Sequence, residues 1–140
     1  MAEKSLAQKL LIKPDHQVRV FNAPEAYHEM LGSIPQNAQV TDEGDGAFDV
    51  VHVFAPDTSI LNRDAPLALE MVKPGGIVWF SYPKQSAKLE TDITRDHGWE
   101  VLDAARWRPV TQISVDETWS ALRFRPIADV GREFNPKGKK

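Results

Sequence analysis

Two runs of residues carry apolar side chains on both alternating faces, and they constrain the fold more than any other feature of the chain. The first run, FDVVHVFA, covers residues 48–55, and the second, IVWFSY, covers residues 77–82. A strand that is apolar on both faces is typical of a parallel sheet with helices on each side, because both faces are then removed from water. We therefore expect the two runs to be adjacent, parallel, central strands of an α/β sheet.

Helical and strand patterns alternate around these two runs, with proline, glycine and capping residues at the boundaries. The alternation predicts a Rossmann-like three-layer sandwich, α/β in class, with a mostly parallel sheet, right-handed crossovers and a C-terminal antiparallel hairpin. We expect helices at 5–12, 24–31 and about 91–106, strands at 18–21, 39–41, 48–55 and 77–82, and hairpin strands at 110–115 and 118–125. A further helix between the strands 48–55 and 77–82 is expected to be capped within 56–59 and again at Asp64. We expect this helix to be broken or kinked at Pro66 and to end at residues 73–76.

The segment around Gly98 admits a second interpretation. Glycine inside a helix destabilises it, so residues 99–102 could instead form a strand. Both alternatives stay open from the sequence.

Length and composition bound the remaining possibilities. The 140 residues fit one domain, which we place at 1–126, followed by a flexible tail at 127–140. The net charge of −3 gives no basic field to recruit nucleic acid or an anionic membrane, and no run approaches the roughly 20 apolar residues of a membrane span. The absence of cysteine excludes disulfides and thiolate catalysis and is compatible with the cytoplasm.

The four histidines, at positions 16, 28, 52 and 97, lack the spacing of a metal site, so no metal is expected. His52 lies in the apolar run, and we interpret it as a packed, hydrogen-bonded core histidine rather than a catalytic base. Ser81 lacks the glycines of a nucleophile elbow, so no catalytic residue is assigned.

Polar side chains follow several of the expected strands. Ligands of parallel sheets bind at the carboxyl ends of the strands, so these positions are the candidates for a binding site. They are Asn22 after the first strand, Asp42 and Glu43 after the second, Tyr82 and Lys84 after the fourth, and Asp116, Glu117 and Trp119 at the tip of the hairpin.

Each candidate has a functional and a structural interpretation. Asp42 or Glu43 could hold a ribose hydroxyl, or could form a solvated acidic turn. Lys84 could bind an anion, or could form an ion pair with Asp116 or Glu117, and we favour the ion pair. Tyr82 and Trp119 could stack on a planar ligand, or could complete the core.

The segments 21–24 (FNAP), 48–55, 73–84 (KPGGIVWFSYPK) and 115–124 (VDETWSALRF) together resemble the class I S-adenosylmethionine-dependent methyltransferase fold. More narrowly, residues 10–125 are similar to an uncharacterised bacterial family of small proteins, a domain of unknown function. That narrower resemblance implies no established activity.

Two departures from methyltransferases set this chain apart. Their first strand is followed by a glycine-rich turn that lets the backbone approach the cofactor, whereas residues 22–24 here are Asn-Ala-Pro. In addition, only six residues separate Thr41 from Phe48, which leaves no room for the helix, strand and helix that wall the adenine side. We therefore expect a truncated fold that uses no cofactor.

Two hypotheses of function remain. The first is a non-catalytic module that binds a protein or a small molecule on a degenerate methyltransferase-like scaffold. The second is a methyltransferase-related, small-ligand-binding enzyme that uses the carboxyl-edge residues. Likeness of fold alone does not decide between them.

Overall fold

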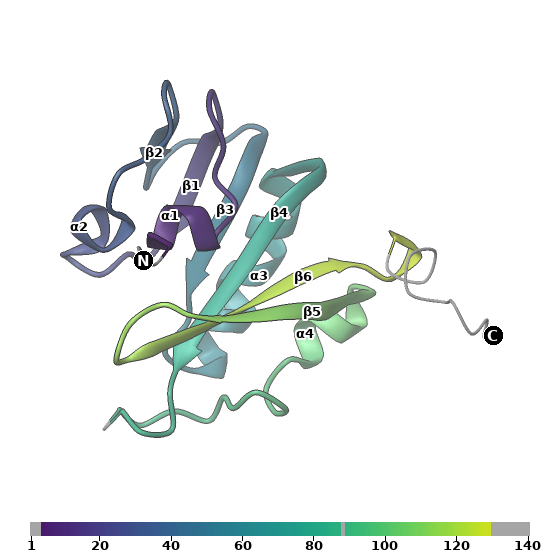
Figure 1. Cartoon of the computed structure of the whole chain (residues 1–140). Helices are drawn as coiled ribbons and strands as arrows, with labels where there is room; N and C mark the ends of the chain where they lie inside the picture. The colour runs from purple at the N-terminus through teal and green to yellow at the C-terminus, as the bar shows by residue number, and fades with distance from the viewer. Residues whose placement is uncertain (1–3, 88, 130–140) are drawn as a thin grey trace, which may run out of the picture.

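The computed structural model describes residues 4–87 and 89–129, which form a six-stranded mixed sheet with the order β2-β1-β3-β4-β6-β5 (Figure 1). The first four strands are parallel, and β6 and β5 continue the sheet in antiparallel pairing. The expected central pair and C-terminal hairpin are therefore confirmed. The strands are β1 (Gln17–Phe21), β2 (Gln39–Thr41), β3 (Phe48–Phe54), β4 (Val72–Pro83), β5 (Trp107–Ser114) and β6 (Trp119–Pro126), and the helices are α1 (Leu6–Lys9), α2 (Tyr27–Leu31), α3 (Thr58–Met71) and α4 (Glu100–Ala104).

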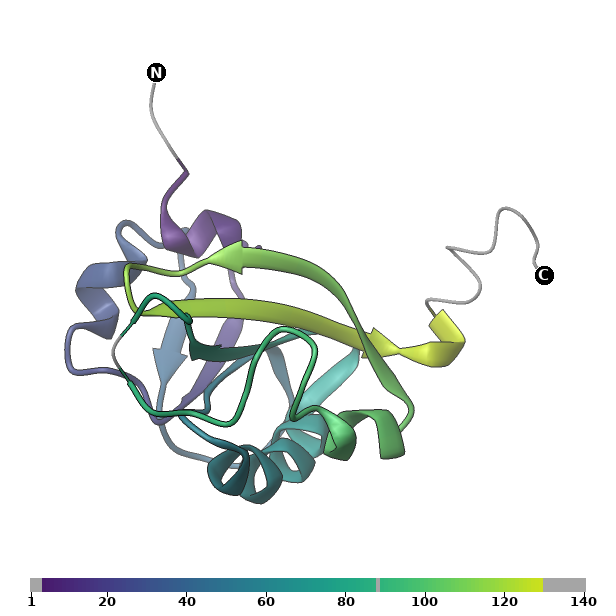
Figure 2. The same ribbon diagram turned by 90° about the horizontal axis from the view of Figure 1, so that it is seen from below.

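Helices cover both faces of the sheet, with α1 and α2 on one side and α3 and α4 on the other (Figure 2). Alternate residues of β3 supply the two cores, as the two-faced pattern predicts. Val51 and Val53 pack with α3 and α4, whereas Val50 and Phe54 pack with α1 and α2. The three-layer prediction is confirmed.

The sheet ends at β2. Residues 42–47, which connect β2 to β3, contain no helix or strand. The expected truncation on this side of the fold is thus present in the structure.

Helix α3 is continuous across Pro66, so of the expected break or kink at this proline the break is wrong. Leu61, Ala65 and Ala68 are buried on one face of the helix and pack against the sheet on both sides of the proline. This packing holds the helix together despite the hydrogen bond that proline removes. Asp57 caps the helix by accepting a hydrogen bond from the amide of Ile60 at 3.0 Å.

Two of the expected helices are shorter than their sequence patterns. The helix expected at 24–31 begins at Tyr27, and residues 24–26 form a turn in which the Tyr27 amide donates to the Pro24 carbonyl. The helix expected at 5–12 ends at Lys9, because Leu11 has a φ of 69° and cannot continue an α-helix.

Residues 73–76 lie inside β4 and do not precede it, which corrects the expected start of this strand. The register between β3 and β4 shifts here, because Phe48 pairs with Val72 while Val50 pairs with Ile77. The extra residues form an irregularity at the amino end of β4. Gly76 is required there, since a Cβ atom would lie 2.9 Å from the Lys73 carbonyl oxygen and 3.0 Å from that of Asp49.

The helix expected over 91–106 is reduced to α4, and the alternative strand at 99–102 is wrong. Gly98 has a φ of +101°, a left-handed conformation that separates α4 from the preceding residues. Residues 84–87 and 89–99 instead lie in a long loop along the carboxyl edge of the sheet (Figure 2). We call this segment the edge loop.

Of the expected tail at 127–140, residues 127–129 are helical and the Ile127 amide donates to the Arg106 carbonyl at 2.8 Å, whereas positions 130–140 lie outside the described residues. Within the described residues, no helix is long and apolar enough to cross a membrane.

Candidate functional site

The turn after β1 is closed by the side chain of Asn22. This residue has a φ of 60°, a left-handed conformation that asparagine tolerates. Its amide nitrogen donates to the carbonyl of Phe54 at 3.1 Å and to the carboxylate of Asp64 at 2.7 Å. The side chain therefore ties the end of β1 to the end of β3 and to α3.

Asp64, only 3% exposed, is the buried carboxylate at this corner. The Nε and Nη2 atoms of Arg63 donate to its two carboxylate oxygens at 2.9 and 3.0 Å. Burial alone would raise the pKa of Asp64, but the hydrogen bonds from Arg63 and Asn22, with the charges of Arg63 and Arg19, hold this pKa below its usual value. The carboxylate is thus ionised and fully engaged within the protein. The sequence had suggested Asp64 as a helix cap, and that prediction is wrong.

Asp42 and Glu43 are exposed in the turn after β2. The Glu43 amide donates to the Thr41 hydroxyl at 3.2 Å, which forms a small turn. Arg19 donates to the Gly44 carbonyl at 3.2 Å and so links this turn to β1. Among the described residues, no hydrogen bond or ion pair joins Asp42 or Glu43 to the other candidates.

The end of β4 and the hairpin tip meet, as the topology predicts. The Lys84 amide donates to the Thr118 carbonyl at 2.7 Å, and the Lys84 ammonium donates to the Ser114 hydroxyl at 2.7 Å. The expected ion pair between Lys84 and Asp116 or Glu117 does not form in the described structure.

The carboxylate of Asp116 is instead used within its own turn. It accepts hydrogen bonds from the amides of Thr118 and Trp119, both at 2.8 Å. Glu117 is exposed to solvent at the tip of the hairpin. Asp116 and Glu117 therefore shape the turn and leave Lys84 to pair with a neutral hydroxyl.

Tyr82 and Trp119 belong to different cores and do not form one stacking site. Tyr82 packs with the α3 and α4 side, where its ring meets Trp99 edge to face at 5.6 Å. Trp119 packs with the opposite side, where its ring meets Phe54 edge to face at 5.0 Å. Tyr82 is buried and Trp119 is partly buried against its core, and the alternative that either ring stacks on a ligand stays a prediction.

An open polar depression of about 460 Å³ lies between the end of β4, the edge loop and the hairpin. We call it the β4 depression. Sequence reasoning found two of its residues and missed Arg95 and Gln112, because nothing in the local pattern indicates that a long loop folds back beside β5. The lining residues are Tyr82, Lys84, Gln85, Ser86, Thr94, Arg95, Asp96, Gln112 and Ser120.

Tyr82 forms the floor of the β4 depression. Its hydroxyl accepts a hydrogen bond from the Gln112 amide nitrogen at 2.9 Å. Burial raises the pKa of the Tyr82 phenol, the charge of Arg95 lowers it and the charge of Asp96 raises it. The phenol thus keeps its proton and lies within the electrostatic reach of both charged side chains.

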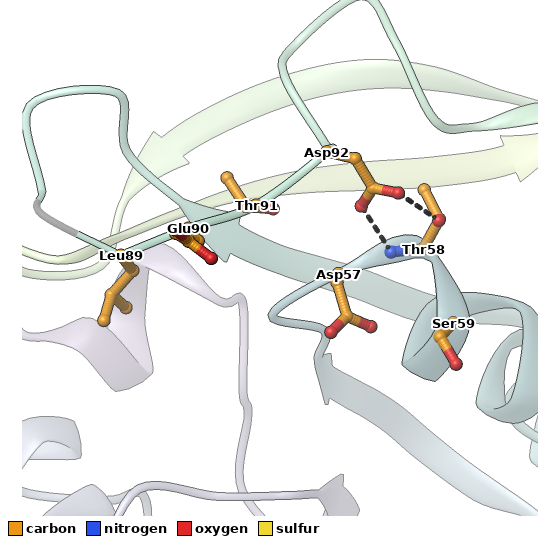
Figure 3. Close-up of a pocket in the computed structure, with 7 residues that line it drawn as sticks. All are labelled: Asp57, Thr58, Ser59, Leu89, Glu90, Thr91 and Asp92. Atoms are coloured by element: carbon orange, nitrogen blue, oxygen red, sulfur yellow. Dashed lines mark hydrogen bonds between the residues drawn. The ribbon is translucent and has the colours of Figure 1, made fainter.

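A second open depression, of about 710 Å³, lies beside the amino end of α3 (Figure 3). Both carboxylate oxygens of Asp92 accept hydrogen bonds from Thr58, at 2.9 Å from its amide and 2.6 Å from its hydroxyl. These bonds lower the pKa of Asp92 and fasten the edge loop to α3. No group of three or more histidine or acidic side chains suited to a metal ion occurs in the described residues.

A buried polar chain runs beneath α2. The Tyr27 hydroxyl lies 2.8 Å from Nδ1 of His52, and Nε2 of His52 lies 2.6 Å from the Ser81 hydroxyl. Burial lowers the pKa of His52 to about 3, so the imidazole is neutral. All three side chains are buried, which confirms the core interpretation of His52.

Comparison with known proteins gives a fold and no close relative. No family model matches the chain, and no curated protein sequence matches it. Among solved structures, the complex of DhpI with SAH superposes with a TM-score of 0.58 at 14% identity, covering 86% of this chain and 82% of that one.

A solved methylase and a solved methyltransferase agree with this result. The ribosomal protein L11 methylase from Lactobacillus delbrueckii subsp. bulgaricus gives a TM-score of 0.55 at 14% identity over 86% of this chain and 74% of that chain. A SAM-dependent methyltransferase from Aquifex aeolicus gives 0.52 at 12% identity, over 84% and 85%. The narrower resemblance to one small bacterial family stays a prediction, whereas the methyltransferase-like α/β fold of this chain is shown.

Proposed function

We propose that this chain is a non-catalytic binding module on a reduced methyltransferase-like scaffold, and that it binds its ligand at the β4 depression. In this proposal S-adenosylmethionine does not occupy the corner after β1. The fold family implies this cofactor, so the residues at that corner decide whether the proposal is sound.

The single observation that carries the proposal is the hydrogen bonding of Asn22. A cofactor bound there needs a backbone that it can approach closely, and glycine provides such a backbone. Here the side-chain amide of Asn22 lies between β1, the Phe54 carbonyl and Asp64, and Pro24 provides no N–H donor. The residues present therefore do not fit the cofactor.

The adenine side of the fold gives further support. The connection from β2 to β3 forms no wall beyond β2, and Asp42 and Glu43 are exposed. A carboxylate in water binds a ribose hydroxyl weakly, because it exchanges one hydrogen bond for another of similar strength. The corner after β1 thus offers neither a cradle nor a covered pocket.

The β4 depression differs from the corner after β1, because it is open and presents hydroxyl, amide and cationic groups from three strands and one loop. A concave surface with convergent polar groups is the usual form of a small-ligand site. The scaffold places these groups rigidly, because Tyr82 and Ser120 lie on paired strands.

Calorimetric titration with S-adenosylmethionine and S-adenosylhomocysteine tests the proposal. We expect no saturable heat at ligand concentrations up to about 1 mM, equivalent to a binding free energy weaker than about 4 kcal/mol. The matched variants Asp42→Asn and Glu43→Gln serve as controls. A micromolar dissociation constant that weakens in either variant would contradict the proposal and establish a cofactor site at β2.

A thermal-shift screen against nucleosides, nucleotides and acidic metabolites is the complementary experiment. A ligand present at 100 times its dissociation constant stabilises the folded state by about 2.7 kcal/mol. The proposal requires at least one ligand whose effect is lost in Lys84→Ala or in Arg95→Gln. It fails if ligands found in the screen are unaffected by both substitutions.

A further inference from the structure

The β4 depression continues into a smaller hollow of about 200 Å³ on the face of the hairpin. Arg95, Asp96 and Gln112 line both hollows and form the ridge between them. Beyond this ridge the lining includes the apolar side chains of Pro109, Val110 and Leu122. A ligand lying across the ridge would therefore meet a polar region at one end and an apolar region at the other.

Arg95 is the exposed cation at the centre of this double hollow. Its guanidinium makes no hydrogen bond or ion pair with another residue in the part of the chain that the structure describes. The other cation, Lys84, donates to the neutral hydroxyl of Ser114 and keeps its charge unneutralised. With Asp96 as the one carboxylate in the lining, two cations and one anion leave a net charge of +1 at the site.

Uncharged polar side chains line the β4 depression beside these two cations. The Tyr82 hydroxyl accepts a hydrogen bond from Gln112 at 2.9 Å and is also hydrogen-bonded to the side chain of Ser120. Ser120 lies beside it, paired across the sheet with Tyr82. A carboxylate is an acceptor that takes several such bonds at once, and the planar fork of arginine matches its two oxygens.

The edge loop holds Arg95 in place. Thr94 and His97 form two backbone hydrogen bonds at 3.1 and 3.4 Å on either side of Arg95. Asp92 is fastened to α3 through Thr58, and Ile93 is fully buried. The guanidinium therefore projects from a loop with fixed ends, which reduces the entropy lost when it binds.

From these contacts we infer that the double hollow binds a small organic monoanion, with its carboxylate at Arg95 and its apolar body against Pro109, Val110 and Leu122. This inference rests on the proposed function and names the ligand class of the same site. It assigns Arg95 as the main anchor.

The test uses three probes of one shape: benzoate, neutral benzamide and cationic benzylamine. Their dissociation constants are measured with the full chain by isothermal titration, or by ligand-detected NMR if binding is weak. We expect benzoate to bind at least tenfold more tightly than benzamide and benzylamine not to bind. Arg95→Gln should weaken benzoate at least tenfold, whereas the matched control Arg108→Gln, an exposed arginine outside both hollows, should change it less than twofold.

The ionic strength gives an independent readout. Binding of benzoate should weaken as salt rises from 20 to 300 mM, because the guanidinium is exposed and its charge is screened. The Arg95→Gln variant should lose this dependence.

Two results would overturn the inference. If benzamide binds as tightly as benzoate with amide shifts at residues 94–96, the anionic class is wrong, while the binding-module proposal stands. If benzoate binds but Arg95→Gln and Arg108→Gln affect it equally, the site is wrong. Saturable binding of S-adenosylhomocysteine at the corner after β1 is a separate result, because it contradicts the proposed function and leaves the anion test intact.

Discussion

Replacing Ser81 with alanine should destabilise the protein through His52, because the Ser81 hydroxyl lies 2.6 Å from Nε2 of that imidazole. The imidazole is neutral, so one ring nitrogen donates and the other accepts. In the native chain, the hydroxyls of Tyr27 and Ser81 satisfy both nitrogens. Removing the Ser81 hydroxyl leaves Nε2 buried without a partner.

The magnitude follows from burial. His52 and Ser81 are both completely buried, so water does not replace the lost partner. A buried polar atom left unpaired costs about 1 to 3 kcal/mol. For a domain of this size, a change of 1 kcal/mol moves the melting temperature by roughly 3 °C, which predicts a loss of about 3 to 9 °C.

Urea denaturation of Ser81→Ala, Tyr27→Phe and the double variant measures this effect and the coupling between the two hydroxyls. The control is Ser59→Ala on the exposed first turn of α3, which should change stability by less than about 0.5 kcal/mol. We expect a coupling free energy of at least about 0.5 kcal/mol, because both hydroxyls act on one ring. If Ser81→Ala is as mild as the control, the hydrogen-bonded chain does not stabilise the fold as argued.

Three other perturbations give direct tests. The pKa of His52 falls from 6.5 in the unfolded chain to about 3 in the folded protein, so stability should fall as the pH drops from 6.5 toward 3, by up to about 1.4 kcal/mol per pH unit. Urea midpoints at pH 7 and 5 should show this slope. The same slope in the His52→Leu variant would refute the role of His52. Gly76→Ala should destabilise by about 1 to 3 kcal/mol, because its Cβ would overlap the carbonyls of Lys73 and Asp49, and an unchanged melting temperature would refute the packing of that bulge. Asn22→Gly keeps the left-handed backbone and removes the amide, so a loss of about 1 to 3 kcal/mol in urea is expected, and a neutral result would show that the corner after β1 does not depend on that side chain.

The sheet was predictable from the sequence because burial on both faces leaves a direct pattern. FDVVHVFA and IVWFSY contain almost no polar positions, so only a central parallel strand accommodates them. The hairpin was predictable for a related reason, since two β-prone runs flank the short turn at 116–117. These signals are local, and the structure confirms them.

The errors arose where tertiary contacts override local preference. Pro66 predicts a broken helix, but burial of its neighbours against the sheet keeps α3 continuous. Conversely, the apolar spacing over 91–106 predicts one helix, whereas the left-handed Gly98 and the packing of Ile93 produce a loop. The continuity of α3 depends on contacts with distant residues, whereas Gly98 is itself a local signal against a continuous helix.

The candidate site was predictable in its position and less so in its chemistry. Strand ends placed Tyr82, Lys84 and the hairpin tip together, and the structure brings Lys84 against Thr118. The sequence could not show that Asp116 is used by its own turn, since that depends on amide directions within the hairpin. Arg95 could not be found either, because its place depends on the path of a long loop.

In the proposed function the corner after β1 is closed to the cofactor and the β4 depression is open. A titration of the isotope-labelled chain with S-adenosylhomocysteine, followed through backbone amide signals, tests the closed corner most directly. We predict no saturable shift at residues 22–23 or 42–43 at ligand concentrations up to about 1 mM, a range that detects binding free energies down to about 4 kcal/mol. Saturable shifts at those residues, with a dissociation constant in the micromolar range, would contradict the account.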